Sequence, residues 1–141
     1  EVGLYHCRSR CVRRSFLCGF GRYSGKRYDH RKRWVKARLR HLRKSFAIDI
    51  ATATSMSNHT HLVLRTRPDL ADTWDDWEVA RRWLWVYPKR KDKQGFACEP
   101  EDREIAAHAD VDAGVEVRAA LTNQDLACAY GLAAETLDAE G

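Results

Sequence analysis

Features that often decide the class of a protein are missing from this chain of 141 residues. No apolar run approaches the roughly 20 residues that a membrane-spanning helix requires, so we expect neither a membrane protein nor a membrane partner. The chain starts at Glu1 without an initiator methionine, a basic leader or an apolar signal segment, and we expect that its beginning has been clipped. With no sign of secretion, a cytoplasmic protein is the default interpretation.

The cysteines show no pairing pattern. Their number is odd, and they are Cys7, Cys11, Cys18, Cys98 and Cys128. Without a secretion signal we expect reduced thiols rather than a disulfide framework. A zinc knuckle would need paired cysteines at close spacing, and Cys7 and Cys11 have no matching second pair. A small zinc protein unrelated to DNA stays open as an alternative, and it would retain zinc after purification.

Acidic residues are scarce in the first half of the chain. Residues 1–67 contain 17 Lys and Arg but only three acidic residues, whereas residues 68–141 contain 8 basic and 17 acidic residues. A basic segment of this density favours a polyanion as partner, because each phosphate contact releases condensed counterions. Nucleic acid is therefore the predicted partner. The alternative is a solvated basic surface that is balanced by the acidic half.

Hydrophobic periodicity predicts both strands and helices before residue 88. Residues 4–12 alternate as a strand, and Phe16 to Cys18 could pair back on it. Residues 28–46 carry apolar side chains at helical spacing, with many basic residues on the other faces. We therefore expect a long amphipathic helix with a strongly basic surface.

A hairpin and a second helix follow. Residues 47–54 and 59–66 alternate again and are separated by a polar turn, which predicts two antiparallel strands. Thr73 to Asp76 resembles a capping box, and apolar residues at helical spacing continue from there to Pro88. We take residues 1–88 as one domain.

The rest of the chain has a different composition. Residues 89–98 read as a polar linker, and residues 99–141 are rich in alanine and acids. Two short helices are plausible there, one over 100–109 and one over 123–130, the second capped by Thr122 and closed by Gly131. Neither has a wide apolar face, so we expect this tail to dock weakly or to be disordered.

Two histidines one position apart stand out in the third strand. His59 and His61 should project from the same face, with alpha carbons roughly 6.5 to 7 Å apart, so both imidazoles could bind one divalent ion. Such an ion could act as a Lewis acid on a phosphate oxygen. Taken alone, the motif more often reflects two histidines on a solvent-facing strand than a metal site.

Three segments in order resemble a known family. They are YHCRSRCVRRSFLCG from Tyr5, YDHRKRW from Tyr28 at the start of the basic helix, and MSNHTHLVL from Met56. Their order resembles the amino-terminal two-thirds of the IS200-like single-strand DNA transposases, and most closely the REP-associated tyrosine transposases. ARRWLWVYP, from Ala80, is similar to the next helix of that group. The resemblance covers about residues 4–95.

The resemblance implies an α+β fold, an antiparallel sheet flanked by helices in a ferredoxin-like sandwich. It also implies that His59 and His61 bind Mg²⁺ or Mn²⁺, and that the partner is single-stranded or hairpin DNA in the nucleoid of a prokaryotic cell. Whether the chain forms a homodimer stays open. The residues that we expect to contact DNA are basic ones in the strands and in the helix: Arg8, Arg10, Arg31, Lys32, Lys36, Arg40 and Arg65.

In the family, a tyrosine on a later helix attacks the scissile phosphate, which gives a covalent phosphotyrosine and a free 3′ hydroxyl. Nothing after Gly95 resembles that part of the family, and we therefore expect an incomplete sandwich. Tyr130 is the only later tyrosine and the one candidate nucleophile, although a tyrosine beside a helix end is more often a packing residue. An active transposase and a DNA-binding remnant that cannot cut both stay open.

Overall fold

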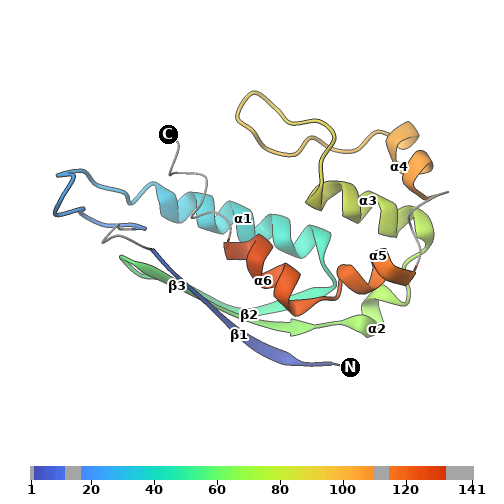
Figure 1. Cartoon of the computed structure of the whole chain (residues 1–141), viewed down its shortest axis with the longest axis horizontal. Coiled ribbons are helices and arrows are strands. Elements are labelled where there is room, and N and C mark those ends of the chain that lie inside the picture. Colours follow the sequence, from blue (N-terminus) through green and yellow to red (C-terminus); the bar gives the residue numbers. More distant parts are fainter. Residues whose placement is uncertain (1, 12–16, 110–114, 133–141) are drawn as a thin grey trace.

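The computed structural model describes residues 2–11, 17–109 and 115–132, and its architecture is α+β, as predicted. A three-stranded antiparallel sheet is packed against helices (Figure 1). None of the helices in these ranges is long and apolar enough to cross a membrane. The elements in chain order are β1 (Leu4–Arg10), α1 (Arg31–Ser45), β2 (Ile48–Ser55), β3 (His59–Thr66), α2 (Pro68–Ala71), α3 (Asp76–Val86), α4 (Asp102–Ala109), α5 (Val115–Ala120) and α6 (Gln124–Leu132).

The central strand of the sheet is β3, with β1 on one side and β2 on the other. Both neighbours are antiparallel to β3, so β1 and β2 run parallel to each other with β3 between them. This is the split β-α-β arrangement of a ferredoxin-like sandwich. The described ranges contain no fourth strand, and the sandwich is incomplete, as the sequence predicts.

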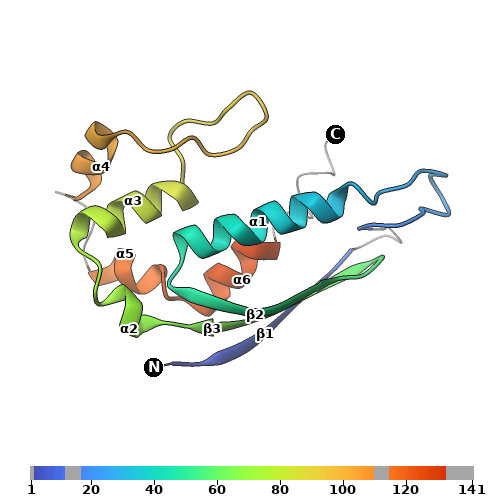
Figure 2. The same cartoon turned by 180° about the vertical axis from the view of Figure 1, so that it is seen from behind.

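In the described part of the chain, the helices that cover the sheet lie on one face, and no described helix covers the other face. Figures 1 and 2 show α1 and α6 lying on the same side of the strands. Strand alternation explains the division, because Cys7, Leu62 and Leu64 point to the helices and are buried, while their neighbours in sequence point away. We call the uncovered side the open face. Its residues are Leu4, His6, Arg8, Arg10, Asp49, Thr52, Thr54, His59, His61, Val63 and Arg65.

A bulge in β2 shifts the alternation of its side chains by one residue. Ile50 pairs with Leu64 on the helix side, whereas Thr52 rather than Ala51 pairs with Val63 on the open face. Ala51 is therefore an extra residue in this strand, and such an insertion bends a strand and increases its twist.

The helix α3 packs against α1 and α4 and buries Val79 and Leu84 in the same core as the sheet. Its capping residue differs from the prediction. Asp75, not Thr73, is the N-cap, and its carboxylate accepts a hydrogen bond from the backbone N–H of Glu78 at 2.8 Å. Thr73 instead donates its hydroxyl to the carbonyl of Leu70. Threonine and aspartate are both suitable N-cap residues. Thr73, however, is hydrogen-bonded to the end of the short helix α2, and Asp75 caps α3.

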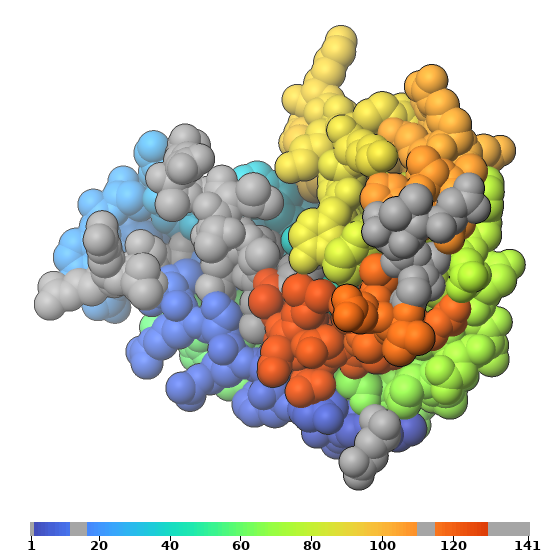
Figure 3. Space-filling model, turned by 45° about the vertical axis from the view of Figure 1, so that its right-hand side comes forward, coloured from blue at the N-terminus to red at the C-terminus, as the bar shows by residue number. Residues whose placement is uncertain are grey.

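The expectation of a weakly docked tail is wrong for the part of it that the structure describes. Ile105, Leu121 and Ala127 are all at most 3% exposed and belong to the same core as the sheet. Arg118 donates hydrogen bonds to the carbonyls of Ala71 and Trp74, which attaches α5 to the segment before α3. In Figure 3 the red atoms of α6 lie directly against the blue atoms of β1. Residues 110–114 and 133–141 lie outside the described ranges.

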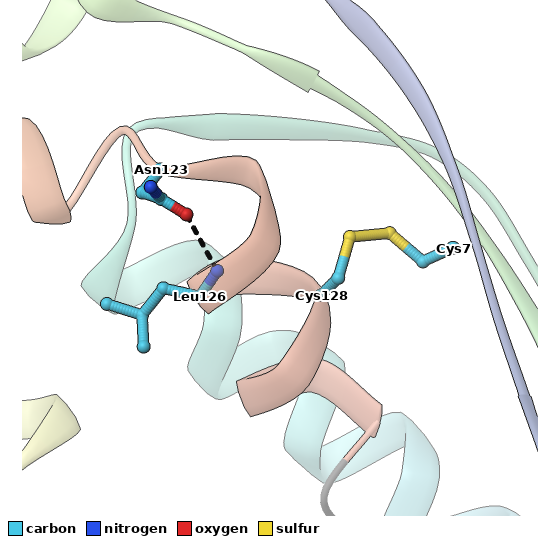
Figure 4. Close-up of a disulfide and its surroundings, with 4 residues drawn as sticks. All are labelled: Cys7, Asn123, Leu126 and Cys128. Carbon is cyan, nitrogen blue, oxygen red and sulfur yellow. Dashed lines mark hydrogen bonds between the residues drawn. A yellow bond between two sulfur atoms is a disulfide. The ribbon is translucent and has the colours of Figure 1, made fainter.

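The expectation of five reduced cysteines is also wrong. Cys7 on β1 and Cys128 on α6 form a disulfide, with alpha carbons 5.8 Å apart (Figure 4). Asn123, not the predicted Thr122, caps α6, because its side-chain oxygen accepts a hydrogen bond from the backbone N–H of Leu126 at 2.8 Å. Cys11, Cys18 and Cys98 take part in no disulfide. Gly131, expected to close the helix, lies within α6.

The segment after β1 returns to the sheet near the β2–β3 turn. The backbone N–H groups of Leu17 and Cys18 both donate to the carbonyl of Ser57, and the thiol of Cys18 donates to that of Met56. This contact places the loop before α1 beside the end of the sheet that carries His59. The predicted extension of the first strand to Val12 and the pairing of Phe16 lie outside the described residues.

Candidate metal and nucleic-acid site

The two histidines of β3 lie side by side on the open face. Thr60 and Leu62 alternate with them and are buried under the helices. The rings of His59 and His61 are half-buried, and their centroids are 4.9 Å apart at an interplanar angle of 79°. Because β3 is the central strand, its backbone is hydrogen-bonded to β1 on one side and to β2 on the other, which fixes the positions of both histidines.

A third histidine joins this pair from β1. The cross-strand partner of His6 is Val63, two residues along β3 from His61, and diagonal neighbours of this kind lie within reach of aromatic side chains. Nε2 of His6 lies 2.7 Å from Nδ1 of His61, and the two rings are stacked with an interplanar angle of 7°. The sequence places His6 on a polar strand face, but its contact with His61 follows only from the β1–β3 register.

Asn58 orients His59. Nδ1 of His59 lies 2.7 Å from the side-chain oxygen of Asn58. An amide oxygen only accepts hydrogen bonds, so Nδ1 carries the proton, and Nε2 of the neutral ring keeps its lone pair. Metal-binding histidines are commonly fixed in this way by a partner on the other ring nitrogen.

Two arginines flank the histidines. Arg8 is the cross-strand partner of His61, and Arg10 is the partner of His59. Both side chains are exposed, and neither forms an ion pair with another described residue. Partial desolvation, followed by the positive charges of His59, His6 and Arg8, lowers the pKa of His61. The histidines thus lie in a basic environment.

Arg65, which the sequence predicts to contact DNA, is engaged in hydrogen bonds within the sheet. Its guanidinium donates two hydrogen bonds to Asp49 on β2, the shorter at 2.6 Å, and Arg67 donates a third at 3.1 Å. These hydrogen bonds lower the pKa of Asp49. Asp49 is the only carboxylate on the open face among the described residues, and its charge is already shared by the two arginines.

The basic residues of α1 lie in a different layer from the histidines. Val35 and Leu42 of this helix are buried, and Leu42 packs in the same core as the sheet residues, on the side that the helices cover. Lys32, Lys36 and Arg40 are exposed, while Arg31 is half-buried with its guanidinium 4.1 Å from the ring centre of Tyr28. The seven predicted DNA contacts are therefore divided between two surfaces, and only Arg8, Arg10 and Arg65 share the open face.

No tyrosine of the described strands points to the open face. Tyr5 alternates with His6 and packs against the core on the helix side. The backbone of Tyr130 lies in α6, which the disulfide holds on the covered side of the sheet. The side chain of Tyr130 is outside the described part. The predicted nucleophile is therefore carried by a helix on the face opposite to His59 and His61.

The donor set of the site is made of imidazoles. Within the described ranges, no group of three or more His, Cys, Asp or Glu side chains is placed so that it could hold a metal ion. His6 and His61 instead meet each other, and His59 contacts Asn58. Neutral imidazole is nevertheless a common ligand of divalent transition metals, and the residues fit such an ion chemically.

No known protein family, curated protein or solved structure matches this chain.

Proposed function

We propose that this chain is a DNA-binding protein of the metal-dependent tyrosine transposase type, which binds single-stranded or hairpin DNA on the open face of its sheet. The observation that carries the proposal is the placement of His59 and His61 side by side on the central strand, each with an arginine as cross-strand partner. Such a role assigns the chain to the nucleoid of a prokaryotic cell.

Charge and shape support a nucleic-acid strand as the partner. The open face carries Arg8 and Arg10 with no carboxylate paired to them among the described residues, and no helix covers it (Figure 2). Phosphate groups of a DNA backbone would replace water around these guanidinium groups, and their counterions would be released. Guanidinium groups suit phosphate because they donate paired hydrogen bonds in a plane.

His59 and His61 would hold the divalent ion of this family. When bound, the ion supplies Lewis-acid stabilisation of negative charge on a phosphate oxygen. The protein residues have other tasks. Asn58 fixes the ring of His59, and Arg8 and Arg10 position the phosphodiester next to the imidazoles.

Strand transfer needs a tyrosine in addition. Its phenol oxygen would form a bond to phosphorus while the bond from phosphorus to the 3′ oxygen breaks; the phenol loses a proton and the 3′ hydroxyl gains one. The open face offers no tyrosine from the described strands, and the helix of Tyr130 lies on the covered side. This placement favours a second candidate function, a non-catalytic DNA-binding remnant of such a transposase.

Binding is tested with a fluorescent hairpin oligonucleotide and its single-stranded counterpart, titrated with the protein at several salt concentrations. We expect the affinity of the wild-type chain to fall steeply with salt. The variant Arg8→Ala with Arg10→Ala should bind more weakly and lose about one unit of salt slope per lost phosphate contact. Lys32→Ala with Lys36→Ala removes the same charge from α1 and should have the smaller effect. Equal losses in both variants, or no salt dependence, would contradict the proposed surface.

Cleavage is tested by incubating the labelled hairpin with the chain and Mn²⁺, followed by a denaturing gel. A covalent band that Tyr130→Phe abolishes would establish the transposase and rule out the remnant. Binding without any covalent band in the presence of Mn²⁺ would establish the remnant. The binding titration measures affinity alone, so a chain that binds the hairpin without cutting it is still distinguished from an active transposase.

A further inference from the structure

We propose that the imidazoles of His6 and His61 together form a stacking platform for one unpaired base, so that the open face takes a single strand or the loop of a hairpin and not a duplex stem. The inference rests on the proposed function and deepens it, because it names the part of the DNA that lies on the sheet and the residues that select it. The two histidines are 55 positions apart in the sequence and meet only in the folded sheet.

The two rings form one flat surface. Nε2 of His6 and Nδ1 of His61 are 2.7 Å apart, the ring centroids are 4.9 Å apart, and the ring planes differ by 7°. The centroid distance is about the nitrogen contact plus one ring radius on each side, so the two nitrogens lie nearly on the line between the centroids. The parallel rings are therefore offset so far that they meet edge to edge, and the pair is wider than a single imidazole.

The platform is accessible and has apolar neighbours. His6 is exposed, and no described helix covers the open face (Figure 2). Leu4 lies two residues before His6 on the same face and is 69% exposed, and Val63 is the cross-strand partner of His6. Stacking on an aromatic ring is tolerant of base identity, because every base has a flat face. A flat pair of rings beside Leu4 and Val63 thus offers a base a large contact surface.

Positive charge lies along the strand that supplies His6. Arg8 is the cross-strand partner of His61, and Arg10 continues the same row of β1. On the other side of the sheet, Thr54 is paired with His61 and carries no charge. Phosphates are therefore attracted to the β1 side, and the bases of the same strand can extend from there over β3. A cationic track beside an aromatic ring is the combination by which proteins bind single strands.

A duplex cannot use the platform in this way. Its bases are stacked on one another, and only their edges are accessible in the grooves. An unpaired base can be splayed out and stacked on a side-chain ring, and histidine is among the rings that serve. The contact with His6 uses Nδ1 of His61, so it leaves Nε2 of that ring for the ion of the proposed function.

The test uses a single-stranded oligonucleotide that carries the fluorescent base 2-aminopurine at each position in turn, and the same strand annealed to its complement. Binding is measured with the full chain at several salt concentrations, without added metal and at pH 8, where an ordinary histidine is neutral. Stacking on a ring quenches this base. We expect the single strand to bind more tightly than the duplex and its fluorescence to fall on binding.

His6→Ala removes one ring of the platform. We expect it to weaken single-strand binding about fivefold or more, as for the loss of one stacked ring, and to reduce the quenching. The salt slope should stay unchanged because no charge is lost. His6→Phe keeps a flat ring without nitrogens and should bind at least as well as the wild type. His30→Ala, at an exposed histidine just before α1, is the matched control and should behave as the wild type does. Circular dichroism checks that the variants remain folded.

Other outcomes overturn the platform in distinct ways. Unchanged affinity and quenching in a folded His6→Ala variant would remove His6 from the binding surface, while salt-dependent binding that Arg8→Ala with Arg10→Ala weakens would leave the proposed function standing. Equal losses in His6→Ala and His6→Phe would indicate a contact through nitrogen and not stacking. Duplex binding as tight as single-strand binding would contradict the selection of unpaired bases. If the wild-type chain bound neither DNA, the proposed function and the platform would fail together.

Discussion

Cys7 and Cys128 join the first strand of the chain to its last described helix, across a sequence separation of 121 residues. The side chain of Cys7 is buried on the covered face of the sheet, so the bond holds α6 between β1 and α1 (Figure 4). Much of the chain that lies between the two cysteines also contributes to the core. The disulfide therefore encloses nearly the whole fold.

We expect Cys128→Ser to lower the free energy of unfolding by about 4 kcal/mol, because the bond removes the closure entropy of a long loop from the unfolded chain. Urea unfolding monitored by tryptophan fluorescence measures the change. Cys98→Ser, which alters a free thiol, is the control and should leave both the midpoint and its response to reductant unchanged. A wild-type midpoint that does not move on reduction would show that the bond adds nothing to stability.

Leu121→Ala should cost about 2 to 5 kcal/mol of the free energy of unfolding, as expected for a large apolar residue removed from a packed core. Leu121 is 0% exposed, and its carbonyl accepts a hydrogen bond from the backbone N–H of Ala47 beside β2. Val115→Ala, at an 86% exposed position in the neighbouring helix, should change stability by less than about 0.5 kcal/mol. Equal effects of the two substitutions would mean that the carboxyl-terminal helices are not part of the core.

His41 should make stability depend on pH. Its Nε2 donates to the carbonyl of Trp85 at 3.1 Å, and partial burial lowers the pKa of this imidazole in the folded state. A lowered folded-state pKa gives stability that is fully present above the unfolded value near 6.5 and is lost as the pH falls through the folded value.

We therefore expect the urea midpoint to decrease between about pH 7 and pH 5, the range below the ordinary histidine value. His41→Gln keeps a hydrogen-bond donor but cannot titrate, so its midpoint should vary less over the same range. His61 also has a lowered pKa, and only the difference between the two proteins measures His41. Parallel pH curves for wild type and variant would rule out this role.

Arg82 connects α3 to α1, and replacing it with Met should destabilise the chain by about 1.5 to 3 kcal/mol per charged hydrogen bond lost without replacement. Its side chain is 17% exposed, donates to Glu78 at 2.6 Å and to the carbonyl of Lys44 at 2.7 Å, and lies 3.9 Å from the ring centre of Trp74. Thermal unfolding measures the loss. Arg103→Met removes an ion pair with Glu101 at an 81% exposed side chain and should have almost no effect.

The sheet could be predicted because its strands alternate clearly. His59 to Thr66 was expected as a strand and is β3, and the pattern of Leu62 and Leu64 against His61 assigns the two faces correctly. The alternation of apolar and polar residues does not show which strands are adjacent in the sheet. The contact between His6 and His61 depends on the register of β1 against β3, since a shift by one residue would turn His6 to the helix side.

The carboxyl-terminal helices were underestimated for a related reason. Among the described side chains, α4 buries Ile105 and α6 buries Ala127, while α5 buries none, so no helix shows a broad apolar face. A single buried side chain has no period to detect. The disulfide was missed because the burial of Cys7 follows from the strand pattern, whereas its partner is fixed only by the packing of α6 on the sheet.

The cross-strand pairing of Arg8 with His61 and of Arg10 with His59 has a thermodynamic consequence. If the face binds an ion and a nucleic acid as proposed, the ion would be repelled by both guanidinium groups, and a phosphate would offset that repulsion while being attracted by the ion. Ion and nucleic acid would then bind cooperatively, each raising the affinity for the other by the same factor, as linkage requires. Under the proposed function, the arginines would therefore make each of the two partners strengthen the binding of the other.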